Sequence, residues 1–185
     1  MIQIISGTDR PESRSFEISK ISQNLFKIHG SESNIINLCG LGLNELNGQQ
    51  YGGALNESSS VGNAVQLVNQ ASGLLFVVPE YNGSFPGALK YFIDHWSYPD
   101  SFESRPVAFI GLGGQWGGLR SVEHLQGVFG YRNSYIFPER VFLTNIWEKL
   151  KDGLISDALC NELLEKQAEN FIKFIRALRS ESLSC

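Results

Sequence analysis

Short apolar runs alternate along this chain with longer segments whose apolar residues recur at helical spacing. A short apolar run is typical of a strand buried on both faces of a parallel sheet, and the spaced segments are typical of amphipathic helices. Five such pairs of run and spaced segment follow one another between Ile2 and Leu178. This repeated order of strand and helix predicts a single parallel sheet with helices on both of its faces.

The expected strands cover residues 2–5, 34–38, 73–78, 106–112 and 135–143. The expected helices include residues 18–28, 61–68, 89–96, 119–129 and 164–178. Pro138 lacks a backbone donor, so it indicates an edge or a bulge in the last strand. Five strands in 185 residues favour a flavodoxin-like three-layer α/β sandwich over a six-stranded dinucleotide fold. We expect one domain over residues 1–179, a glycine-rich connection over 39–55 and a flexible tail over 180–185.

Composition and charge argue against several classes of function. The formal net charge of −4 provides no basic surface for nucleic acid. No apolar run approaches the length of a membrane span, and the first residues do not fit a signal peptide. Metal-ligand spacing is absent among the cysteines and histidines: Cys39, Cys160, Cys185, His29, His95 and His124. Three scattered cysteines favour reduced thiols, so we expect a cytoplasmic protein without a metal site.

The third expected strand ends abruptly at Pro79, and turn-prone residues 80–84 separate it from a helix that begins after Pro86. Ligands of open α/β sheets bind at such carboxyl ends of strands. Tyr81 supplies an aromatic face and Asn82 supplies an amide, which together suit a flat ring that forms hydrogen bonds. The alternative interpretation is an ordinary turn between a strand and a helix.

Residues 6–15 follow the first expected strand and lead into the first helix. Their side chains supply four hydroxyl and two guanidinium groups: Ser6, Thr8, Ser13, Ser15, Arg10 and Arg14. The amino end of a helix attracts anions through its free N–H groups and its dipole. A helix cap needs only one hydroxyl, so this excess favours a site for a phosphate monoester. The alternative is a capped helix start with solvated charges.

A third unusual loop follows the fourth expected strand. Residues 113–118 contain four glycines, whose backbone N–H groups can approach a ligand closely. Trp116 in this loop either covers the face of a ring or contacts another subunit. The run that begins at Gly111 has Trp116 in place of the third glycine of a dinucleotide fingerprint, and no Walker ending is present. A single phosphate is therefore favoured over a pyrophosphate.

Together these loops resemble the NADPH-dependent FMN reductase family, flavodoxin-like enzymes that include azoreductases, quinone reductases and chromate reductases. The resemblance rests on residues 7–15, 79–84 with 86–90, and 113–117. It implies that the FMN phosphate is held by Thr8, Arg10, Ser13 and Ser15. It implies that the isoalloxazine ring lies along Pro79, Glu80, Tyr81, Asn82 and Gly83, with Gly113, Gly114, Gln115, Trp116 and Gly117 on its other side. A 2′-phosphate of NADPH would contact Arg14 or Arg120.

The resemblance also implies a reaction. NADPH or NADH gives hydride to FMN and leaves, and a quinone, azo, chromate or flavin acceptor then takes its place in a ping-pong cycle. No catalytic side chain is needed, because the flavin itself carries the chemistry. The partners implied are a small-molecule acceptor and a second copy of the chain in a homodimer or homotetramer, which Phe92, Trp96 and Tyr98 also favour. Two alternatives stay open: a flavodoxin-type electron carrier and a flavin-free α/β binding domain.

Overall fold

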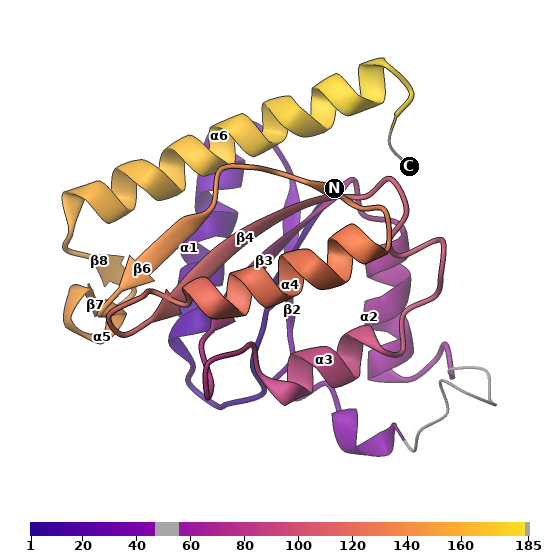
Figure 1. The fold of residues 1–185 in the computed structure, drawn as a ribbon, viewed down its shortest axis with the longest axis horizontal. Helices are drawn as coiled ribbons and strands as arrows, with labels where there is room; N and C mark the ends of the chain where they lie inside the picture. The colour runs from indigo at the N-terminus through magenta and orange to yellow at the C-terminus, as the bar shows by residue number, and fades with distance from the viewer. Residues whose placement is uncertain (47–55, 184–185) are drawn as a thin grey trace.

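The computed structural model of the protein describes residues 1–46 and 56–183. Its centre is a parallel sheet in the order β2-β1-β3-β4-β5, and β6 also pairs with β4 (Figure 1). The strands are β1 (Ile2–Ser6), β2 (Ser33–Asn37), β3 (Gly73–Pro79), β4 (Pro106–Gly113), β5 (Tyr135–Ile136) and β6 (Val141–Thr144). This order is the flavodoxin-like one, so the predicted fold class is confirmed.

Helices cover both faces of the sheet and make the outer layers of a three-layer sandwich. One face packs against α1 (Arg14–Ile28) and α6 (Ala158–Ser180), and the other packs against α2 (Ser60–Asn69), α3 (Gly87–Ile93) and α4 (Leu119–Tyr131). Because successive side chains of a strand point to opposite faces, Phe76 and Val77 of β3 belong to different cores. Phe92 and Trp96, two of the three aromatic residues expected at a subunit contact, are buried in the core on the α3 side. The third, Tyr98, is exposed.

The fifth expected strand, residues 135–143, is divided into β5 and β6, and both segments pair with β4. Pro138 lies in the interval between them. Since proline has no N–H to donate to a ladder, the chain leaves the sheet there and returns, as the sequence indicates for an edge. The carboxyl end of β6 is thereby brought level with the carboxyl end of β4, where Thr144 pairs with Gly113.

Several short elements have no counterpart in the sequence prediction. They are the 3₁₀ helix η1 (Leu43–Glu45), α5 (Ile146–Lys149), β7 (Leu150–Lys151) and β8 (Leu154–Ile155), the last two forming an antiparallel pair. They are too short to show a period in the sequence. The expected connection 39–55 is described only as far as residue 46, and residues 184–185 of the expected tail lie outside the described part of the chain. Within residues 1–46 and 56–183 no helix is long and apolar enough to span a membrane.

The parallel strands end at one edge of the sheet, and the segments that follow them meet there (Figure 1). These are the β1–α1 loop (residues 7–13), the β3–α3 loop (residues 80–86), the β4–α4 loop (residues 114–118) and the α5 segment (residues 145–157). The first three are the loops that the sequence singles out. The fourth comes to the same edge only because β6 pairs with β4.

Candidate functional site

A cavity of about 330 Å³ lies at this edge of the sheet, a volume at the lower end of the range for ligand pockets. Residues from all three predicted loops, from the strand ends and from α5 line it: Thr8, Arg10, Pro11, Glu12, Ser13, Arg14, Ser15, Pro79, Glu80, Tyr81, Leu112, Gly113, Ile146 and Trp147. The carboxyl ends of the strands thus form one site, as the parallel arrangement requires. Its lining combines apolar and aromatic side chains with hydroxyl groups and guanidinium groups.

The β1–α1 loop and the first residue of α1 bring two guanidinium groups to the amino end of α1, with the carboxylate of Glu12 between them in the sequence. Ser13 is the N-cap of this helix, with a φ of −74°, and its Oγ accepts a hydrogen bond from Phe16 N at 3.2 Å. The first helical turn still leaves amide N–H groups without intrahelical acceptors. Arg10 and Arg14 are both exposed, and neither forms an ion pair within the described residues. This end of the cavity is therefore suited to an anion.

The hydroxyl groups of this loop are buried, unlike its guanidinium groups. Thr8, Ser13 and Ser15 are each less than a tenth exposed. Thr8 Oγ1 lies 2.9 Å from the hydroxyl of Tyr81, so one hydrogen bond joins the loop after β1 to the loop after β3. Arg10 N also donates to Thr8 Oγ1, at 3.3 Å. Thr8 is thus the residue that fixes the two loops relative to each other.

The β3–α3 loop owes its shape to Asn82 and Gly83, which have φ angles of 53° and 76°. Tyr81 and Ser84 exchange backbone hydrogen bonds at 2.8 and 3.1 Å, so the four residues make a tight reverse turn. Two central residues with positive φ are what a type I′ turn requires, and Asn-Gly is its preferred sequence. Asn82 and Gly83 are not among the residues that line the cavity; the turn that they form holds Tyr81 against it.

Glu80 lines the cavity, between Pro79 and Tyr81 in the sequence. Its backbone N–H donates to Leu112 O at 3.1 Å, and its Oε1 lies 3.5 Å from Arg120 Nη1. Its second oxygen, Oε2, is buried and has no hydrogen-bond partner within the described residues. A buried acceptor without a donor is costly, so this oxygen is an unpaired polar atom of the lining residues.

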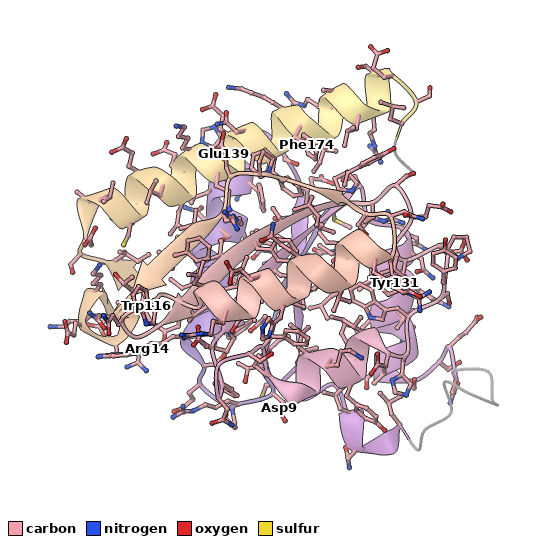
Figure 2. The ribbon with its side chains drawn as sticks, in the orientation of Figure 1. Asp9, Arg14, Trp116, Tyr131, Glu139 and Phe174 are labelled. Carbon is pink, nitrogen blue, oxygen red and sulfur yellow. The ribbon has the colours of Figure 1, made fainter. Side chains whose placement is uncertain are left out.

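The β4–α4 loop contributes less to the cavity than its glycine content suggests. Gly113 lines the cavity, but Gly114, Gln115, Trp116 and Gly117 are not among the lining residues. Gly117 has a φ of 56°, and a Cβ atom there would lie 2.9 Å from the carbonyl carbon of Phe142. The close approach that its missing side chain allows is therefore to β6 of the same chain. Figure 2 shows Trp116 and Arg14 at the same end of the sheet, and Trp116 is half exposed.

Sequence reasoning missed Trp147 and Ile146, which line the cavity from α5. α5 is only four residues long, so no periodicity marks it. One signal was present: both residues directly follow the second half of the last expected strand. In a parallel sheet, that position lies at the same edge as the other loops. Because the strand is interrupted at Pro138, its second half is hard to recognise in the sequence as a separate strand that ends at this edge.

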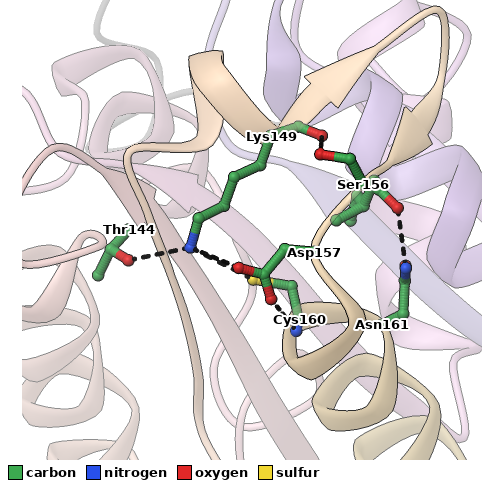
Figure 3. A network of polar contacts seen from close by, with 7 residues as sticks. Thr144, Lys149, Ser156, Asp157, Cys160 and Asn161 are labelled. Carbon is green, nitrogen blue, oxygen red and sulfur yellow. Dashed lines mark hydrogen bonds and ion pairs between the residues drawn. The ribbon is translucent and has the colours of Figure 1, made fainter.

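A polar network holds the α5 segment against the start of α6 (Figure 3). Lys149 Nζ lies 3.1 Å from Asp157 Oδ2 and donates to Thr144 Oγ1 at 3.4 Å. Asp157 is also the N-cap of α6, because its Oδ1 accepts from Cys160 N at 2.9 Å. The hydrogen bond to Asp157 raises the pKa of Lys149, and the bonds from Cys160 N and Lys149 lower the pKa of Asp157. Burial raises the pKa of the Cys160 thiol, so this cysteine is not set up as a nucleophile.

Among residues 1–46 and 56–183 no group of histidine, cysteine and carboxylate side chains could hold a metal ion. The cavity also contains no pairing of a nucleophile with a general base. His124 accepts or donates a hydrogen bond to Ser84 at 2.9 Å outside the lining, and His95 is buried with Nδ1 2.7 Å from Tyr91 O. The arrangement can bind and orient a ligand that has an anionic end, but its own side chains offer no covalent chemistry.

Comparison with known proteins gives a consistent result. Residues 1–149 match the model of a family described as NADPH-dependent FMN reductase. An NAD(P)H-dependent FMN reductase of Schizosaccharomyces pombe is 30% identical over 89 residues, which are 48% of this chain and only 43% of that protein. An FMN-dependent NADPH-azoreductase of Staphylococcus saprophyticus is 26% identical over 91% of this chain and 89% of its own length. The structure of FerB, a flavoenzyme NAD(P)H:(acceptor) oxidoreductase of Paracoccus denitrificans, matches with a TM-score of 0.77 at 20% identity, over 95% of this chain and 97% of FerB.

Proposed function

The chain belongs to the NADPH-dependent FMN reductase family, and we propose that it is an FMN-dependent NAD(P)H oxidoreductase that reduces a small-molecule acceptor. The observation that carries this proposal is the single cavity in which the β1–α1, β3–α3 and β4–α4 regions meet. All three regions lie within the residues that match the family. The azoreductase relative, which aligns over most of both chains, supports a reductive activity of this kind.

The residues at the cavity fit FMN in both charge and shape. The exposed guanidinium group of Arg10 and the amino end of α1 would hold a phosphate monoester, with the hydroxyls of Thr8, Ser13 and Ser15 beside them. Pro79, Tyr81 and Leu112 provide apolar contact for a ring. Bound there, FMN would supply the hydride chemistry that the side chains lack.

The protein's own contribution would be binding, orientation and exclusion of water. The Asn82–Gly83 turn and the hydrogen bond between Thr8 and Tyr81 hold the lining in place before any ligand enters. One cavity of modest size supports a ping-pong order, in which the oxidised nicotinamide leaves before the acceptor enters. Arg120 is engaged with Glu80, so Arg14 is the better candidate for the 2′-phosphate if NADPH is the donor. We extend the proposal to a quinone or azo acceptor, a homodimer or homotetramer, and a cytoplasmic location.

Purified protein would test the proposal directly. We expect the absorbance spectrum of bound oxidised flavin, either as isolated or after addition of FMN. Without air, NADPH or NADH should bleach that absorbance within minutes, and a quinone or an azo dye should restore it.

Two other outcomes would contradict the proposal in different ways. A protein that binds FMN but is not bleached by either nicotinamide would be an electron carrier of flavodoxin type. A protein that takes up no FMN would be a flavin-free binding domain. Riboflavin, which lacks the phosphate, serves as the matched ligand that shows whether the anion end of the cavity is used.

A further inference from the structure

Two exposed tryptophans lie at the edge of the sheet where the strands have their carboxyl ends, and only one of the two lines the cavity. Trp147 of α5 is 48% exposed and lines it, whereas Trp116 is 54% exposed and is not among the lining residues. An indole ring is a large apolar surface, so a ring left half exposed inside a ligand cavity can gain substantially by contact with a flat ligand. Of the two tryptophans, Trp147 is therefore the one placed to contact a ligand in the cavity.

Trp147 is held at this position from both ends of α5. On one side, Asn145 N donates to Gly114 O at 3.1 Å, which ties the start of α5 to the β4–α4 loop. On the other side, Lys149 forms its ion pair with Asp157, which ties the end of α5 to the start of α6. The backbone that carries the indole ring is therefore held in place before a ligand arrives.

Gly114 fits the same arrangement. A Cβ atom at this position would lie 3.2 Å from Trp147 Cη2, so the indole ring packs over the Gly114 backbone. The backbone of the β4–α4 loop thus packs against the indole ring of Trp147, and no ligand can occupy the space between Gly114 and the ring. This gives Gly114 a role that does not require it to line the cavity.

We infer that Trp147 contacts the ring system of FMN by stacking and thereby sets the affinity of the chain for flavins. This inference rests on the proposed function, and it adds a residue outside the three loops that the sequence indicates. A contact with the ring has a signature that a contact with the phosphate lacks. It contributes to the binding of FMN and riboflavin alike, whereas Arg10 and the amino end of α1 contribute to FMN alone.

The test is a pair of flavin titrations on the whole chain with three variants. Trp147→Ala should weaken the binding of both FMN and riboflavin about tenfold, and Trp147→Phe, which keeps an aromatic face, should restore most of the loss. Tyr131→Ala is the control, because Tyr131 is an exposed aromatic residue at the end of α4 that does not line the cavity, and it should leave both affinities unchanged. Thermal unfolding of each variant without flavin checks that the fold is retained.

Several results would overturn the inference. Unchanged flavin affinity in Trp147→Ala would exclude a ring contact. An equal loss in Trp147→Phe and Trp147→Ala would show that the size of the indole, and not its aromatic face, matters. A loss for FMN without a loss for riboflavin would move Trp147 to the phosphate end. If the unchanged chain binds neither flavin, the proposed function itself fails, and that outcome is visible before any variant is made.

Discussion

The cavity has two walls that are built in different ways. The polar wall consists of the β1–α1 loop and Tyr81, and it presents hydroxyl groups and guanidinium groups that are adjacent in the sequence. The packed wall consists of the α5 segment, which lines the cavity, and the β4–α4 loop that supports it. Gly114 packs against the indole ring of Trp147, Gly117 against the backbone of β6, and Gly118 against the backbone of β4. On the polar wall the chemistry belongs to the side chains themselves. On the packed wall it depends on how distant segments are brought together.

Because of this difference, we expect substitutions in the two walls to affect different properties of the protein, ligand binding in one case and stability in the other. A change to a guanidinium group of the polar wall should weaken ligand binding and leave the fold intact, because Arg10 and Arg14 are exposed and form no ion pair within the described residues. A change to a glycine of the packed wall should destabilise the fold first.

Gly118→Ala should destabilise the packed wall severely. Gly118 has a φ of 81°, and an added Cβ would lie 2.6 Å from the backbone nitrogen of Leu112. Backbone strain and overpacking together should lower the free energy of unfolding by about 3 kcal/mol. Urea unfolding measures this loss as a shift of the midpoint at constant slope.

Gly127→Ala is the control for that experiment. Gly127 lies inside α4, and a Cβ atom there would meet nothing within 4 Å. Alanine should therefore raise the free energy of unfolding by about 0.5–1 kcal/mol, because it restricts the unfolded chain and favours the helix. If both variants changed stability by the same amount, close packing would not be the function of the glycines in the β4–α4 loop.

Arg10→Ala should weaken phosphate binding at the polar wall without changing the stability of the fold. Loss of a charged hydrogen bond to phosphate should weaken FMN binding by roughly tenfold to a hundredfold. Riboflavin binding and the free energy of unfolding should stay unchanged, because riboflavin has no phosphate and the guanidinium is exposed. Titrations with the two flavins measure this contrast, and Arg176→Ala on α6 controls for the loss of one positive charge. Equal weakening of both ligands would refute the phosphate role.

The hydrogen bond between Thr8 and Tyr81 can be isolated by a double-mutant cycle. Thr8→Val and Tyr81→Phe each remove one hydroxyl of the 2.9 Å pair. The coupling free energy between them should be about 1 kcal/mol in unfolding measurements, the usual value for one such bond. After Thr8→Val, the second change should therefore cost much less than it does alone. Additive losses would mean that the two hydroxyls do not stabilise each other.

The polar wall could be predicted from the sequence, because its signals are local. The excess of hydroxyls in residues 6–15, the end of β3 at Pro79 and the Asn82–Gly83 turn are each visible within a few residues. The strand order follows from the count of strand–helix units. The residues of these loops that the sequence indicates and that line the cavity are Thr8, Arg10, Ser13, Arg14, Ser15, Pro79, Glu80 and Tyr81, whereas Ser6, Asn82 and Gly83 do not line it.

The packed wall could not be predicted in the same way, because its determinants are tertiary. The glycines of residues 113–118 suggest close approach to something, but only the structure shows that Gly117 and Gly118 approach β6 and β4 of the same chain. Trp147 reaches the cavity because β6 rejoins β4 after the interruption at Pro138. No pattern of apolar residues marks either fact, since both depend on contacts between residues far apart in the chain.

The smallest effect on stability should come from the ion pair between Lys149 and Asp157, which joins the α5 segment to the start of α6. The pKa of Asp157 is lowered in the folded chain, so its contribution to stability is complete above the unfolded value of about 3.9 and is lost as the pH falls through the folded value. The pKa of Lys149 is raised, so its contribution is complete below about 10.4 and is lost as the pH rises through the folded value. The pair therefore stabilises the fold across the neutral range and fails first in acid.

Asp157→Asn removes the charge but keeps an N-cap residue for α6, whereas Asp157→Ala removes both. At neutral pH the asparagine variant should unfold only about 1–2 °C below the unchanged chain, because an ion pair with partly exposed side chains is weak. That difference should vanish in acid, where Asp157 is protonated, while the alanine variant should keep a deficit from the missing cap. Thermal unfolding from neutral to acid pH measures both. A deficit of the asparagine variant that persists unchanged in acid would show that Lys149 does not hold α5 by charge, and Trp147 would then depend on Asn145 and Gly114 alone.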